Sequence, residues 1–99
     1  MTDPRAYVCA AEVALLLPEA QTLKDRRSVV KSLTERLSRR FNLSVADLDG
    51  GQRAANWAKL GIAAVSNSPA QARQCIDAAL RFLDEADGAD LLSAEFLEM

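Results

Sequence analysis

The chain has 99 residues, of which 49% are hydrophobic and 26% charged, and its formal net charge is −2. This length gives a single domain, residues 1–99, with one modest core. The sequence contains no histidine, so it lacks the commonest general base and most zinc sites. The first five residues do not resemble a targeting segment, and no apolar run is long enough to cross a membrane. We therefore expect a cytoplasmic protein without membrane contact.

Residues 7–17 predict a first strand, because apolar side chains alternate along them and Pro18 then removes a backbone donor. Residues 22–40 predict a helix whose N-cap is Thr22, with Asp25 near the positive end of the helix dipole. One face of this helix is apolar at helical spacing.

Residues 42–49 predict a second strand, and Gly50–Gly51 open a loop over residues 50–56. Residues 57–67 predict a third, central strand, dense in small apolar side chains. Ser68, Pro69 and Gln71 have the pattern of a capping box that starts a second helix, which runs to about Glu85. Gly88 follows this helix, and residues 91–99 predict a last strand.

The order β-α-β-β-α-β predicts an α+β chain with the ferredoxin-like split fold, an antiparallel sheet with both helices on one face. The other face of the sheet is then open. This weakly polar face would carry some of Val8, Ala10, Ala14 and Leu16, together with residues of the central third strand. Such a face favours a homodimer or a partner contact, or it is a small alanine-rich surface exposed to water. The sequence leaves both interpretations open.

The first predicted helix is strongly basic in an acidic chain. Residues 22–41 contain seven positively charged side chains against Asp25 and Glu35, whereas residues 77–99 contain seven acidic side chains against Arg81. Such a cluster of cations is suited to phosphate contacts. The alternative is a solvated face on which Asp25 and Glu35 pair locally. The candidate nucleic-acid-binding residues are Lys24, Arg26, Arg27, Lys31, Arg36 and Arg39.

Two of the basic positions do not follow the pattern of the others. Arg26 falls near the apolar side of the helix and Arg40 near its margin. Each is expected to extend its side chain to the rim, keeping the guanidinium in water.

Other polar groups give weaker indications, and we predict no catalytic residue, no cofactor and no metal. Asp47 and Asp49 have a spacing that could hold Mg²⁺ or act as an acid/base pair, but we interpret them as surface residues. Trp57 is interpreted as a partial core plug rather than a platform for bases. Cys9 and Cys75 are interpreted as small, buried, reduced side chains.

Residues 17–33 carry a recognisable motif: Leu17–Pro18, then Thr22–Leu23–Lys24, Arg26–Arg27 and Lys31–Ser32–Leu33. In this order the motif resembles the YlxP-like family of small bacterial proteins, known as domain of unknown function 503. Residues 41–46, and residues 57–67 with Trp57 and Lys59–Leu60–Gly61, resemble the second and third strands of the family. Thr22 stands where serine is usual and Arg26 where lysine is usual, and the loop over residues 50–56 is particular to this chain.

The resemblance implies a ferredoxin-like fold, no established enzymatic activity, and genes placed among those for translation initiation and ribosome maturation. It also implies a possible binding set, which is Lys24, Arg26, Arg27 and Lys31. We therefore expect a non-enzymatic accessory factor whose partner is ribosomal RNA or a translation-related protein. The alternative is a homo-oligomeric protein-interaction or small-ligand regulatory module that uses the open sheet face.

Overall fold

Two helices and four strands follow one another in the predicted order. The computed structural model describes residues 4–97. Its elements are β1 (Tyr7–Leu16), α1 (Leu23–Phe41), β2 (Ser44–Asp47), β3 (Trp57–Ser66), α2 (Pro69–Glu85) and β4 (Asp90–Leu97). The ferredoxin-like α+β fold is thus confirmed. The last two residues of the predicted final strand, 98–99, lie outside the described residues.

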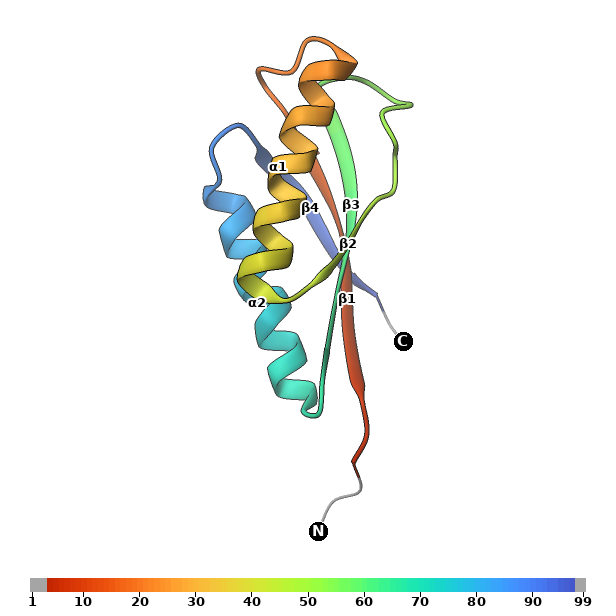
Figure 1. Ribbon diagram of the computed structural model, residues 1–99, viewed down its shortest axis with the longest axis vertical. Helices are drawn as coiled ribbons and strands as arrows, with labels where there is room; N and C mark the ends of the chain where they lie inside the picture. Colours follow the sequence, from red (N-terminus) through yellow and green to blue (C-terminus); the bar gives the residue numbers. More distant parts are fainter. Residues whose placement is uncertain (1–3, 98–99) are drawn as a thin grey trace.

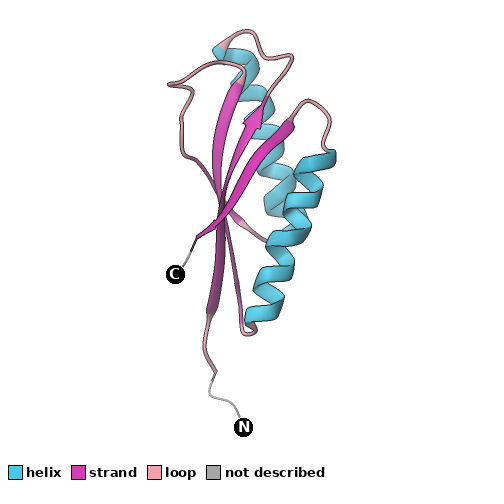
Figure 2. Cartoon of the chain, turned by 180° about the vertical axis from the view of Figure 1, so that it is seen from behind, coloured by secondary structure: helices cyan, strands magenta, loops and turns pink. Residues whose placement is uncertain are grey.

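The four strands form one antiparallel sheet in the order β2-β3-β1-β4. The two central strands pair along their whole length, from Tyr7 with Ser66 to Leu16 with Trp57. Both helices pack on one face of the sheet, side by side and running in opposite directions (Figure 1). Seen from behind, the other face is not covered by any helix or strand of residues 4–97 (Figure 2).

The core lies between this sheet and the two helices. Alternate residues of β1 are fully buried, as predicted, among them Val13 and Leu15. The buried positions of β3 also alternate, and they include Leu60 and Ile62. The helices complete the core with side chains at helical spacing, which are Val30, Leu33 and Leu37 from α1 and Ala72, Ile76, Ala79 and Leu83 from α2.

The start of α1 is a complete capping box. The Thr22 hydroxyl accepts from the backbone N–H of Asp25 at 3.1 Å, and the Asp25 carboxylate accepts from the backbone N–H groups of Thr22 and Gln21 at 3.2 and 3.0 Å. These bonds satisfy donors that the first turn of a helix leaves free. They also hold the pKa of Asp25 below its usual value, with the Gln21 bond as the largest cause.

The start of α2 differs from the predicted capping box. Ser68 is the N-cap and accepts from the backbone N–H of Gln71 at 3.3 Å, as expected. The Gln71 side chain, however, binds the hydroxyl of Ser66, and that hydroxyl accepts from the backbone N–H of Ser68. The Gln71 side chain is therefore linked to the backbone N–H of Ser68 through the Ser66 hydroxyl, whereas a capping box would join them directly.

Strand β2 is shorter than predicted because the chain turns directly after Asp47. Gly50 and Gly51 have φ angles of 65° and 82°, a left-handed conformation that glycine adopts at little cost. Leu48 keeps one bond to β3, from its backbone N–H to the carbonyl of Lys59 at 2.8 Å. Its side chain lies over Gly61, where an added Cβ would be 3.4 Å from the Leu48 Cδ1. Leu48 therefore covers β3 on the open face of the sheet.

Neither α1 nor α2 is long and apolar enough to span a bilayer, and no other helix occurs in residues 4–97.

Candidate functional site

Five of the six predicted binding residues lie on the solvent-exposed side of α1. The helix turns Arg26, Val30, Leu33 and Leu37 toward the sheet. The remaining predicted cations are exposed and lie along successive turns: Lys24, Arg27, Lys31, Arg36 and Arg39. The helical spacing thus predicted the exposure of these five side chains, and the structure has all five exposed along α1.

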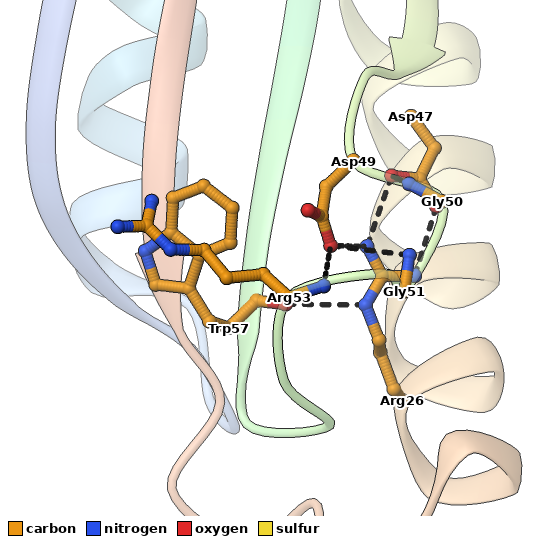
Figure 3. A network of polar contacts seen from close by, with 7 residues as sticks. All are labelled: Arg26, Asp47, Asp49, Gly50, Gly51, Arg53 and Trp57. Atoms are coloured by element: carbon orange, nitrogen blue, oxygen red, sulfur yellow. Dashed lines mark hydrogen bonds and ion pairs between the residues drawn. The ribbon is translucent and has the colours of Figure 1, made fainter.

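Arg26 does not lie on that surface, and the prediction that it extends to the rim is wrong. Only 4% of its side chain is exposed. Its Nη1 and Nη2 donate to the two carboxylate oxygens of Asp47 at 2.9 and 3.0 Å, and Nη2 also reaches Asp49 at 3.4 Å (Figure 3). Its Nε donates to the backbone carbonyl of Trp57 at 3.1 Å. Arg26 is therefore neutralised inside the protein and is removed from the set that can meet a phosphate.

Asp47 and Asp49 are likewise not the free surface carboxylates that the sequence indicated. Their side chains are 30% and 11% exposed, and both pair with Arg26. Asp47 also accepts from the backbone N–H of Gly50 at 3.0 Å, and Asp49 accepts from that of Gly51 at 3.1 Å. We call these three side chains, Arg26, Asp47 and Asp49, the Arg26 tether, because they hold the turn after β2 against α1.

The bond between Arg26 and Asp47 keeps both of these side chains ionised. The hydrogen bond from Arg26 is the largest cause that lowers the pKa of Asp47, and the same bond raises the pKa of Arg26. A carboxylate held ionised in this way is a poor general acid at neutral pH. Within residues 4–97, no three histidine, cysteine, aspartate or glutamate side chains gather as a metal site would require.

A hollow of about 360 Å³ lies between the first half of α1 and the glycine turn. Arg27 and Lys31 line it from the helix, and Gly50 and Gly51 line it from the turn. Leu23, the first residue of α1, also lines it and is 54% exposed. Because Asp47 offsets the charge of Arg26, the cations available to a ligand in this hollow are Arg27 and Lys31.

The local pairing that would make α1 an ordinary solvated face is not seen. The Asp25 carboxylate caps the helix, and among the ion pairs formed by residues 4–97 neither Asp25 nor Glu35 has a partner. Arg36 instead donates to the backbone carbonyl of Ser32 at 3.4 Å. Two arginines in the last turn, Arg39 and Arg40, lie at the negative end of the helix dipole, which favours them there.

Trp57 lies on the open face of the sheet, so its interpretation as a core plug is wrong. It is half-buried and alternates with the fully buried Ala58. The guanidinium of Arg53 stands over its ring, 4.5 Å from the centroid. Nearby on the same face, Lys59 pairs with Glu12 at 3.3 Å. This end of the open face is therefore polar and carries both signs of charge.

The rest of the open face is apolar. A shallow hollow of about 240 Å³ is lined by residues of β1, β2 and β3, most of them small, and by Leu97 of β4. Val8 and Val65 stand further along the same face and are 47% and 64% exposed. The predicted weakly polar surface is thus confirmed in its position.

The cysteines are free, as expected, and both are half-buried. The Cys75 thiol donates to the backbone carbonyl of Phe41 at 3.0 Å. Burial raises the pKa of this thiol, which disfavours the nucleophilic thiolate.

The tether is the arrangement that sequence reasoning missed. Its signal was present as an arginine on the apolar side of a helix together with two acidic residues at the end of a neighbouring strand. A charge near a core needs a partner, and Asp47 and Asp49 were the unassigned candidates.

Comparison with known proteins places the chain in a family. Residues 8–96 match a family model described as "Protein of unknown function (DUF503)". A curated relative, "Uncharacterized protein YlxP" of Bacillus subtilis (strain 168), is 34% identical over 74 residues, which make up 75% of this chain and 79% of the relative. The "De novo designed protein Ferredog-Diesel" aligns over 90% of this chain and 84% of its own, with 16% identity and a TM-score of 0.36. The family match runs from β1 to β4 and so includes α1 and the tethered turn.

Proposed function

The chain belongs to the DUF503 family of proteins of unknown function, and we propose that it is a cytoplasmic, non-enzymatic factor that docks on structured RNA through the exposed cations of α1. One observation carries this proposal. Five basic side chains lie exposed along successive turns of α1, and none forms an ion pair within residues 4–97. Cations left free in this way release counterions from a phosphate backbone when they bind it, which is the main source of affinity for nucleic acids.

The spacing of these cations suits a polymer rather than a single anion. Lys24 and Arg39 are separated by about 22 Å at 1.5 Å of helix rise per residue. A surface of this length meets several backbone phosphates at once. Contacts of this kind position a protein on RNA without reading its bases. The docking would therefore depend on the shape and charge of the RNA more than on its sequence.

The hollow beside α1 gives one phosphate a defined place. Arg27 and Lys31 are one turn apart and line the same hollow. Gly50 and Gly51 form the opposite wall, and at Gly50 a Cβ would meet nothing within 4 Å. A sugar-phosphate backbone can therefore approach the turn closely. The Arg26 tether holds that wall in position.

The role we propose is that of an accessory factor in ribosome maturation or translation, with ribosomal RNA as the partner. A non-enzymatic role is supported by the chemistry of the polar groups. The two carboxylates with the most suggestive spacing are committed to Arg26, and the raised pKa of Cys75 disfavours its thiolate.

The test is binding of the pure protein to ribosomal subunits and to their isolated RNA over a series of salt concentrations. The variant Arg27→Glu/Lys31→Glu/Arg39→Glu removes three of the exposed cations of α1. The matched control, Arg5→Glu/Arg53→Glu/Arg73→Glu, changes the net charge equally on other surfaces. Saturable binding that falls steeply with salt, lost in the α1 variant and kept in the control, is the expected result. Equal loss in both variants would indicate a general charge effect and contradict docking through α1.

A second function is favoured by the open sheet face. Its apolar hollow and the exposed Val8 and Val65 suit a second copy of the chain. The polar end carries Glu12 and Glu95 beside Arg53 and Lys59, a pattern that can complement itself across a twofold axis. In this role the chain is a homo-oligomeric protein-interaction module, or a regulatory module with a small ligand bound between two sheets.

Light scattering at rising protein concentration tests this second function. A homodimer that Val65→Glu dissociates and Ser28→Glu leaves intact would support it. Ser28 lies on the exposed side of α1, so this control adds the same charge and leaves the sheet face unchanged. A monomer at every concentration would contradict it.

A further inference from the structure

Three arginines from two helices converge at one hollow between α1 and α2. Arg36 and Arg40 come from the last two turns of α1, and Arg81 comes from α2. All three are exposed and line a hollow of about 480 Å³. Within residues 4–97 none of them forms an ion pair. Arg81 is the one basic residue in the acidic segment 77–99, so the sequence alone did not associate it with α1.

Two aromatic rings hold the arginines of α1 in place. Phe41 and Phe82 meet edge to face, with ring centroids 5.7 Å apart. The guanidinium of Arg36 stands 5.5 Å from the Phe82 centroid, and that of Arg40 stands 5.6 Å from both centroids. A guanidinium on an aromatic face directs its in-plane N–H groups away from the ring, where they can meet an anion. In Arg36 the Nε–H is used by the Ser32 carbonyl, which leaves the Nη groups for this role. The cluster is therefore partly ordered before any ligand binds.

The charge of the hollow limits what it can hold alone. Glu85 and Asp87 line the same hollow as the three arginines. Their carboxylates reduce the attraction for a free anion. A ligand gains enough affinity here only if it is also bound elsewhere on the protein.

The second point of attachment is the hollow lined by Arg27 and Lys31. Arg27 and Arg40 lie on the same helix, about 20 Å apart at 1.5 Å of rise per residue. One phosphate group is too small to bridge this distance, whereas a continuous phosphate backbone can. One hollow is lined by α1 and the glycine turn, and the other by α1 and α2.

We propose that Arg36, Arg40 and Arg81 bind a second stretch of phosphate backbone of the same RNA that docks at Arg27 and Lys31. This inference rests on the proposed function. It extends the binding surface from α1 onto α2 and adds Arg40 and Arg81 to the contact set. The ligand is a nucleic-acid backbone long enough to reach both hollows.

The experiment measures fluorescence anisotropy of a labelled RNA hairpin with a stem of two helical turns, over a salt series. The proteins are the wild type, Arg81→Gln, Arg36→Gln/Arg40→Gln/Arg81→Gln, and Arg27→Gln/Lys31→Gln. Arg73→Gln, an exposed arginine of α2 outside the hollow, is the control. Inorganic phosphate is the competitor. Because Arg36 and Arg40 pack on Phe82, a thermal melt of the triple variant checks that it remains folded. Arg81→Gln leaves these packing contacts in place.

The slope of log affinity against log salt concentration should become shallower by about 0.9 for Arg81→Gln and by about 2.7 for the triple variant, taking the roughly 0.9 per phosphate contact of duplex DNA. The control keeps the wild-type slope. If Arg81→Gln and the triple variant bind like the wild type while Arg27→Gln/Lys31→Gln loses affinity, the second contact is refuted and α1 docking stands. If the wild type does not bind the hairpin, both proposals fail. Displacement of the RNA from the wild type by millimolar inorganic phosphate would also refute a polymer ligand.

Discussion

Arg26 binds both carboxylate oxygens of Asp47, with Nη1 to Oδ2 at 2.9 Å and Nη2 to Oδ1 at 3.0 Å. The two residues are 21 positions apart, one on α1 and one at the end of β2. Through its Nε the same guanidinium binds the carbonyl of Trp57 at the start of β3. One side chain thus joins three elements, and its paired, forked geometry is one that arginine can form and lysine cannot.

Arg26→Ala is expected to lower the free energy of unfolding by about 3 kcal/mol, because removing one partner of a buried pair leaves the others without compensation. Asp49, whose side chain is 11% exposed, would then lose the guanidinium that it pairs with. Urea denaturation followed by circular dichroism measures the change.

Arg26→Lys serves as the control for charge. It restores a cation but not two parallel hydrogen bonds, so its stability should lie between those of the wild type and Arg26→Ala. A value for Arg26→Ala within about 0.5 kcal/mol of the wild type, the range of an ordinary surface substitution, would contradict the tether.

Stability should depend on pH through Asp47. Its pKa in the folded protein is lowered from 3.8, chiefly by the hydrogen bond from Arg26. The unfolded chain therefore binds a proton first as the pH falls, so the contribution of Asp47 is complete above its unfolded pKa and is lost as the pH drops through the folded value.

Urea unfolding between neutral pH and pH 3 checks this dependence. The wild type should lose stability below about pH 4, near the ordinary pKa of aspartate. Asp47→Asn should start less stable and lose less over the same interval. Parallel pH curves for the two proteins would show that Asp47 has no shifted pKa.

Millimolar Mg²⁺ or Ca²⁺ should leave the melting temperature of the wild type unchanged. Both carboxylate oxygens of Asp47 and the Oδ2 of Asp49 are already bound by Arg26 and by the amides of the glycine turn. A thermal shift assay in chloride salts, with NaCl at matched ionic strength, makes the measurement. A rise in melting temperature specific to the divalent ions would show that a cation competes successfully with the guanidinium.

Thr22→Ala should destabilise the protein by about 1 kcal/mol through the loss of an N-cap. The bond it removes is the one from the Asp25 backbone N–H to the Thr22 hydroxyl. Ser28→Ala, an exposed position within α1, is the matched control and should change stability little. Chemical denaturation of both variants compares them, and equal effects would mean that the cap contributes nothing particular.

Local sequence patterns predicted the parts of this fold that depend on neighbours in the chain. The alternation in β1 predicted its buried face, and Thr22 with Asp25 predicted the start of α1. The exposure of Arg27 and Lys31 also followed from helical spacing. Each of these features is decided by contacts within a few residues, so a single segment contains the information.

The features that were missed depend on segments brought together by the fold. Arg26 was placed correctly near the apolar side, but its partners lie more than 20 positions away. Arg81 joins Arg36 and Arg40 only because α2 packs beside α1. Trp57 was different, since its alternation with Leu60 and Ile62 already indicated the open face. At this position the alternation of the strand decides the face, and it outweighs the preference of tryptophan for cores.

Asp47, Leu48 and Asp49 are consecutive, yet they face opposite sides of the sheet. The two carboxylates reach back to α1, while Leu48 lies across Gly61 on the open face. Three consecutive residues therefore hold this edge of the sheet by contacts on both of its faces. A force that lifts Leu48, whether from a bulkier residue at position 61 or from a molecule pressed onto the open face, would pull on the backbone that carries both carboxylates. Binding on the open face of the sheet would in this way shift the glycine turn, and with it the wall of the hollow beside Arg27 and Lys31.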